Sequence, residues 1–153
     1  MKIREFSPKD FGAVSRLWRR SEMQIRPGDS KEELRRKLER DPDLFLVAEE
    51  ESKIVGVVIG GWDGRRGWIY RLAVDPRFRR RRIARKMLLE VERRMRKKGV
   101  PRVHALVFNW NAPSLNLFES SGYEKQSNLV VVGKSLVSDK ETGPKVDNPG
   151  KRQ

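Results

Sequence analysis

The alternation of apolar and polar residues is clearest between Trp68 and Met95. Residues 68–74 are rich in aromatic and β-branched side chains, which predicts a strand. Asp75-Pro76 ends this strand, because proline lacks an N–H group and keeps the preceding residue extended. In residues 83–95 apolar side chains recur every three or four positions, which predicts a helix with one apolar and one basic face.

The rest of the chain divides into strand-like and helix-like segments. Ser7 and Ser30 are each followed three positions later by an acidic residue, a capping pattern that predicts a helix starting at each. A short helix is expected over residues 113–120. Apolar runs predict further strands at residues 2–6, 44–50, 54–62 and 103–108, and two more between 123 and 136.

These segments suit a single domain over residues 1–137. In residues 138–153 Val146 is the one large apolar side chain. Such a segment buries too little apolar surface to offset the entropy lost on ordering, so we expect a disordered tail.

Positive charge is concentrated in one part of the chain. The sequence has 35 Lys and Arg against 21 Asp and Glu, a net charge of +14, and residues 77–102 hold thirteen of these bases but two of the acids. Residues 79–82, four consecutive arginines, lie between the predicted strand and helix. Unpaired N–H groups and the dipole of a helix N-terminus favour anions, so we predict a site for an anion, most simply a diphosphate. Residues 93–98 could instead form a solvated basic face.

The same region contains Val74, Pro76 and Phe78, followed by Arg79 and Ala84 at the start of the predicted helix. In these residues and their spacing it resembles the GNAT superfamily of acyl-CoA-dependent N-acetyltransferases, whose fingerprint is Val-x-Pro-x-[Tyr/Phe] followed by [Gln/Arg]-x-x-Gly-x-[Gly/Ala]. Arg82 replaces the Gly of this fingerprint. Further resemblance runs through residues 3–18, 44–62 and 111–123. It implies an α/β fold, a mixed, mostly antiparallel sheet flanked by helices.

The resemblance also implies which residues bind acetyl-CoA, the acyl donor. The backbone of Leu72, Ala73 and Val74 would pair with the pantetheine amides. The backbone N–H groups of Arg80, Arg81, Arg82, Ile83 and Ala84 would hold the diphosphate, with Arg79 and Arg85 alongside. Asn111 would hydrogen-bond the pantetheine arm, and Phe118 would pack near the thioester. No metal is implied.

Arg82 is the main departure from the family pattern. Glycine lets the backbone approach a phosphate without interference from a Cβ atom. The Arg82 side chain could point outward, add a charge-assisted hydrogen bond to a phosphate, or obstruct the site. We expect retained binding.

Proton transfer is the least determined part of the chemistry. Family members often have an acid, His or Tyr at the positions of Trp68, Leu106 and Phe118, and none of these three can carry a proton. Tyr70, on the same strand face as Trp68, is the best substitute donor, although it could be only an amphipathic strand residue. His104, the single histidine, is more simply a surface or structural residue. A water molecule could also relay the proton.

We therefore expect direct transfer of acetyl from acetyl-CoA to a primary amine of a small molecule, a peptide N-terminus or Lys. The alternatives are a non-catalytic acyl-CoA-binding module, and a protein that contacts the ribosome or nucleic acid through its basic helix face. The lack of Cys predicts a cytoplasmic setting, and the absence of long apolar runs predicts no membrane span. The high charge content suggests a thermophilic source. A homodimer is left open.

Overall fold

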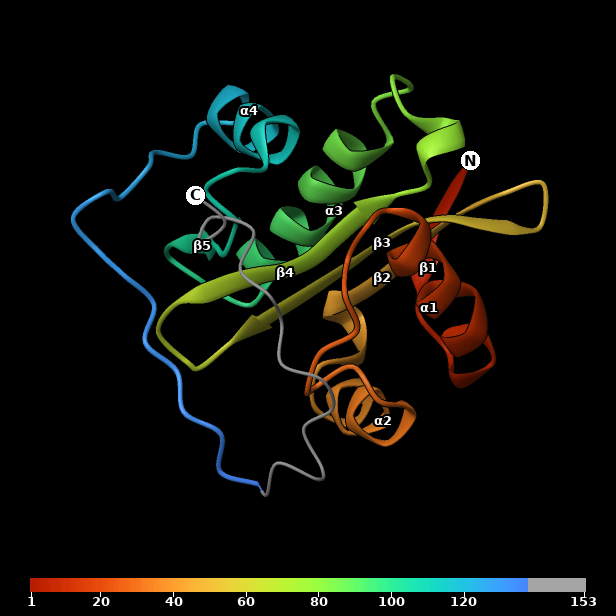
Figure 1. The fold of residues 1–153 in the computed structure, drawn as a ribbon, viewed down its shortest axis with the longest axis horizontal. Coiled ribbons are helices and arrows are strands. Elements are labelled where there is room, and N and C mark those ends of the chain that lie inside the picture. Colours follow the sequence, from red (N-terminus) through yellow and green to blue (C-terminus); the bar gives the residue numbers. More distant parts are fainter. Residues whose placement is uncertain (138–153) are drawn as a thin grey trace, which may run out of the picture.

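In the computed structural model, residues 1–137 are described, and their strands form one sheet in the order β1-β2-β3-β4-β5 (Figure 1). Neighbouring strands from β1 to β4 are antiparallel, and β5 runs parallel to β4. The predicted mixed, mostly antiparallel sheet is confirmed. The strands are β1 (Lys2–Glu5), β2 (Phe45–Glu50), β3 (Lys53–Trp62), β4 (Gly67–Val74) and β5 (Val103–Ala105).

Helices cover both faces of the sheet. Figure 1 shows α1 and α2 on one side and α3 and α4 on the other. The α-helices are α1 (Phe11–Arg20), α2 (Lys31–Arg40), α3 (Ile83–Lys97) and α4 (Ala112–Ser120), and short 3-10 turns are η1 (Pro8–Asp10), η2 (Pro42–Leu44) and η3 (Pro76–Phe78). Within residues 1–137, no helix combines the length and apolar character that crossing a membrane requires.

The capping pattern at Ser30 acts as predicted. The Ser30 hydroxyl accepts a hydrogen bond from the backbone N–H of Glu33 at 3.2 Å, and the Glu33 carboxylate accepts one from the Ser30 N–H at 3.0 Å. These bonds satisfy N–H groups that a helix start leaves without intrahelical partners. They fix the start of α2.

Glycines in the sheet allow α3 to pack unusually close. A Cβ atom on Gly56 would lie 2.6 Å from the Met87 sulfur, and one on Gly60 would lie 2.8 Å from a Val91 methyl. Real Cβ atoms do not approach other atoms this closely, so a larger residue at either position would force Met87 or Val91 to shift. The long helix is therefore held in a fixed position over the sheet.

Two predictions about the C-terminal part of the domain are wrong. The strand expected over 103–108 ends at Ala105, and residues 121–137 form no strand. The apolar side chains there, among them Val130 and Val132, are exposed. β-Branched composition predicts a strand only where a neighbouring strand accepts its hydrogen bonds, and no described residue does so here. The predicted disordered tail, 138–153, lies outside the described residues.

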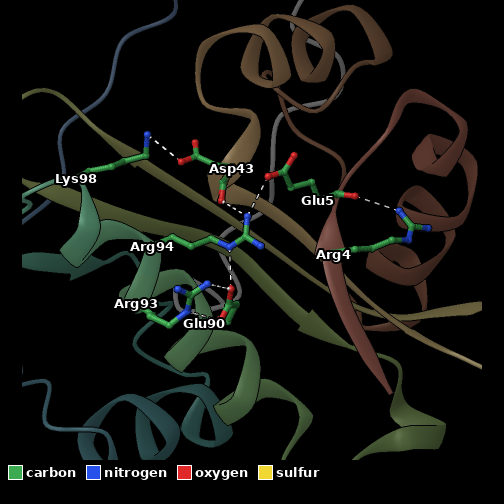
Figure 2. Close-up of polar contacts among 7 residues, drawn as sticks. All are labelled: Arg4, Glu5, Asp43, Glu90, Arg93, Arg94 and Lys98. Carbon is green, nitrogen blue, oxygen red and sulfur yellow. Dashed lines mark hydrogen bonds and ion pairs between the residues drawn. The ribbon is translucent and has the colours of Figure 1, made fainter.

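A charged network joins α3 to the last residue of β1 and to η2 (Figure 2). The Arg94 guanidinium donates to the carboxylates of Glu90 at 2.8 Å and Glu5 at 3.1 Å, and to the backbone carbonyl of Asp43 at 3.1 Å. Arg93 also donates to Glu90, at 2.7 Å. Hydrogen bonds from Arg93 and Arg94 lower the pKa of Glu90 from 4.5 to about 2.

This network predicts an acid-sensitive contribution to stability. Because the pKa of Glu90 is lowered on folding, its contribution is present above pH 4.5 and is lost as pH falls through about 2. We expect Glu90→Gln to lower the free energy of unfolding by about 1 kcal/mol at neutral pH. Urea titrations should show the difference from wild type shrinking with acidification.

Glu39→Gln is the matched control, because Glu39 pairs with Arg35 on the exposed face of α2. It should change stability by less than about 0.5 kcal/mol. A Glu90→Gln effect that is independent of pH would contradict the ionic origin.

Candidate functional site

β4 extends beyond its partner β5. The two strands pair only at Gly67–Val103, Trp68–His104 and Ile69–Ala105, whereas β4 continues to Val74. Within residues 1–137, the side of β4 that faces away from β3 therefore has no strand partner over residues 70–74. Within this stretch the Val74 carbonyl accepts a hydrogen bond from Ser21 Oγ and the Arg71 carbonyl accepts one from Trp18 Nε1, each at 3.4 Å. The remaining N–H and C=O groups along this edge can pair with an extended ligand.

A bulge in β4 determines which of its side chains face α1 and which face α3. Val57 pairs with Ala73 but Ile59 pairs with Tyr70, so β4 contains one extra residue between them. Arg71, in the bulge, has a left-handed backbone with φ of 54°. As a result Tyr70 and Ala73 pack in the cluster beside α1, while Leu72 packs against the cluster that includes α3.

A cavity of about 560 Å³ opens where β4 ends and α3 begins. Most of the predicted cofactor residues lie around it, together with two apolar side chains. Its lining residues are Val74, Phe78, Arg79, Arg80, Arg82, Ile83, Ala84, Arg85 and Leu117. The cavity thus combines an apolar side with several guanidinium groups.

The N-terminus of α3 points its unpaired donors at this loop. Arg82 is the N-cap residue and supplies no side-chain hydrogen bond to the helix start. The first helix-type backbone bond there is from the Lys86 N–H to the Arg82 carbonyl, so the N–H groups of residues 83–85 are left for a ligand. Arg82 has φ of 58° and Arg80 has φ of 64°, and both side chains are exposed. The loop therefore adopts at Arg82 the left-handed conformation that favours glycine.

Several predicted residues lie outside the cavity. Asn111 Oδ1 accepts a hydrogen bond from the Ser114 N–H at 3.2 Å and so caps α4. Phe118 is buried and packs edge-on against Tyr123, and its neighbour Leu117 reaches the cavity in its place. The sequence signal for Leu117 was its apolar character in α4, next to Phe118. The remaining residues away from the lining are Leu72, Ala73 and Arg81.

Aromatic side chains gather on the other side of β4. Trp68 stacks on Tyr70 at 6.4 Å and on His104 at 4.9 Å between ring centroids. Burial, and then the negative charge of Asp63, raise the pKa of Tyr70, so its hydroxyl keeps its proton at neutral pH. Burial, and then the positive charge of Arg102, lower the pKa of His104 and favour its neutral form. On this surface the Tyr70 hydroxyl stays protonated, and His104 accepts a hydrogen bond from Arg102 at 3.4 Å.

Comparison with known proteins identifies the family. The sequence profile described as "Acetyltransferase (GNAT) family" matches residues 11–123. The chain belongs to this family. It is 42% identical over 142 residues to acetyltransferase ECA0875 of Pectobacterium atrosepticum and 39% identical over 142 residues to acetyltransferase SG1711 of Sodalis glossinidius, covering 92% of this chain and 99% of each relative.

The protein is an N-acetyltransferase that uses acetyl-CoA as acyl donor. Its fold is also similar to the crystal structure of the PaiA N-acetyltransferase of Thermoplasma acidophilum in complex with coenzyme A. That match has a TM-score of 0.72 and 23% identity, and covers 80% of this chain and 89% of the other. Its own geometry suits the cofactor, because the uncapped α3 N-terminus, the basic cavity and the free edge of β4 adjoin one another.

The left-handed backbone at Arg82 predicts a stability change. A non-glycine residue in this conformation is strained by roughly 1–2 kcal/mol, and glycine relieves the strain while losing more entropy on folding. We expect Arg82→Gly to raise the free energy of unfolding by about 0.5–1 kcal/mol, measured by chemical denaturation without cofactor.

Arg82→Ala is the matched control, because it removes the guanidinium but keeps the Cβ atom. It should leave stability within about 0.5 kcal/mol of wild type. A destabilised Arg82→Gly protein would show that the loop has a different conformation.

Proposed function

We propose that this protein transfers acetyl directly from acetyl-CoA to a primary amine within a ternary complex. The observation that carries the proposal is the free edge of β4 at residues 70–74, which ends at the basic cavity. One side of that edge faces α3 and its anion-binding N-terminus, and the other faces the aromatic side chains around Tyr70. Donor and acceptor could then meet from opposite sides of β4.

The cofactor would be held mainly by backbone groups and by charge. The N–H groups of residues 83–85 and the positive end of the α3 dipole suit the diphosphate. Arg79, Arg80 and Arg85 border the same cavity and would neutralise phosphate charge. The backbone of Leu72 and Val74 would pair with the pantetheine amides, while their side chains stay in the apolar layer. When bound, the cofactor supplies the activated acetyl group.

Tyr70 is the proposed proton donor. In direct transfer the neutral amine nitrogen forms a bond to the acetyl carbon and releases one proton to solvent water, while the carbon–sulfur bond breaks and the leaving thiolate takes a proton. The Tyr70 hydroxyl makes no side-chain hydrogen bond within residues 1–137, and its raised pKa keeps it protonated. The sequence contains no Cys, so no cysteinyl acyl-enzyme can form.

The basic face of α3 gives less support to the nucleic-acid alternative. Arg93 and Arg94 pair with Glu90, and Arg96 lies 3.7 Å from Glu92, so part of its positive charge is neutralised within the helix. The arginines that border the cavity would bind the cofactor instead. We propose a cytoplasmic site of action on the absence of Cys alone.

Cofactor binding is the first test. Calorimetric titration with acetyl-CoA should show saturable binding, and Arg79→Ala should weaken it by about tenfold because a charge-assisted phosphate contact is lost. Added salt should weaken binding to the wild type more than binding to the variant.

Arg93→Ala is the control, because Arg93 lies on α3 away from the cavity and pairs with Glu90. It should bind acetyl-CoA like the wild type. An absence of binding by folded wild-type protein would refute the proposed function.

The role of Tyr70 is tested by kinetics. Tyr70→Phe should lower kcat by at least about tenfold with little change in KM, because a proton donor acts in the transition state. Since the pKa of Tyr70 is raised, the wild-type rate should climb with pH as the amine loses its proton and should show no falling limb near neutrality. Release of free thiol from acetyl-CoA measures kcat and KM of the variant and the pH dependence of the wild-type rate. An unchanged kcat would exclude Tyr70 and favour a water relay.

A further inference from the structure

A cation–π contact joins two segments that are far apart in the chain. The Arg26 guanidinium lies 4.4 Å from the centre of the Phe108 ring, and Phe108 stacks on Trp110 at 5.2 Å. Arg26 belongs to the segment between α1 and α2, whereas Phe108 lies between β5 and α4. The contact therefore joins the two segments that border the divergence of β4 from β5.

Arg71 holds the first of these segments over the β4 bulge. Its guanidinium donates to the Gln24 carbonyl at 3.0 Å, pairs with the Asp29 carboxylate at 2.9 Å and lies 4.5 Å from the centre of the Trp18 ring. The segment that carries Arg26 is thus anchored on Arg71, which directly follows Tyr70, the proposed proton donor, in β4.

The charges around this opening are unbalanced. Within residues 1–137 the Arg26 guanidinium has no carboxylate partner. The neighbouring carboxylates are already engaged, because Asp29 accepts from the Arg26 N–H at 2.8 Å as well as from Arg71. Glu33 accepts from the N–H groups of Gly28 and Ser30. One guanidinium is therefore available to a ligand, while these carboxylates are not.

This arrangement suits an acidic acceptor better than a basic one. A guanidinium stacked on an aromatic ring keeps its edge N–H donors free, and this planar edge matches a carboxylate. A polyamine would place its second ammonium group near Arg26 and Arg71, where the Asp29 carboxylate is already paired with Arg71. Phe108 and Trp110 are 40% and 49% exposed, which leaves room for a chain to continue across them.

We propose that Arg26 selects acceptors with a carboxylate close to the reacting amine, and specifically peptide N-termini that begin with an acidic residue. The proposal rests on the proposed transferase function. Arg26 would pair with the acidic side chain, and the exposed rings of Phe108 and Trp110 would contact the residues that follow.

The experiment compares acceptors that differ only in charge. Peptides beginning with Asp, Ala or Lys, together with free aspartate and spermidine, are assayed by thiol release at fixed acetyl-CoA. Wild-type kcat/KM should be about tenfold higher for the Asp peptide than for the Lys peptide. Free aspartate should react more slowly than the Asp peptide, because it lacks the contacts with Phe108 and Trp110.

Variants then assign the preference to Arg26. Arg26→Gln should lower kcat/KM about tenfold for the Asp peptide while leaving the Ala peptide within about twofold. Arg26→Glu should reverse the order of the Asp and Lys peptides. Arg36→Gln, on the exposed face of α2, is the matched control and should behave as wild type.

Several results would overturn the proposal. A wild-type preference for spermidine or the Lys peptide would do so, as would an equal loss for every acceptor in Arg26→Gln, which would indicate a purely structural role. Thermal unfolding and acetyl-CoA affinity of each variant confirm that it is folded. Absence of transfer to all acceptors despite cofactor binding would refute the transferase function as well, whereas transfer without charge preference would refute this proposal alone.

Discussion

The close packing of α3 on the glycines of β3 is the constraint on which the rest of the site depends. Met87 and Val91 occupy space that Cβ atoms at Gly56 and Gly60 would fill, so these glycines let the two side chains pack directly on the β3 backbone. This places the α3 N-terminus at the end of β4, where the cavity opens. The charged network of Arg94 secures the helix farther along. The anion site is therefore positioned by packing along most of the helix length.

The buried carboxylate of Asp75 forms ion pairs with residues from two different segments, Arg20 at the end of α1 and Arg77 in η3. Asp75, which directly follows β4, is 1% exposed and pairs with Arg20 at 3.0 Å and Arg77 at 2.8 Å. Arg20 ends α1 and leads into the segment that carries Arg26, whereas Arg77 begins the loop that leads to the arginines of the cavity. The carboxylate is buried, but the Arg20 and Arg77 side chains are 46% and 65% exposed, so solvent screens each pair and each stabilises the fold modestly. The segments that follow α1 and β4 thus share Asp75 as a common partner.

The sequence predicts those features that depend on local patterns. The helical spacing of residues 83–95 identified α3, the capping residues at Ser30 identified α2, and the fingerprint from Val74 to Ala84 named most residues that line the cavity. The contact between Arg26 and Phe108 was missed, because it joins segments far apart in the chain. The strands expected after Tyr123 were wrong, since strand formation depends on a partner that composition does not reveal.

The loop of residues 79–82 combines a strained backbone with a high density of positive charge. Arg80 and Arg82 adopt left-handed backbones that arginine disfavours, and they do so beside Arg79 and Arg85 around one cavity. Without an anion these like charges repel one another, and solvent and salt screen them only partly. A bound diphosphate would replace repulsion with charge-assisted bonds and would use the N–H groups that the strained backbone exposes. A bound diphosphate would therefore offset both the strain and the repulsion, and its binding would stabilise the folded protein.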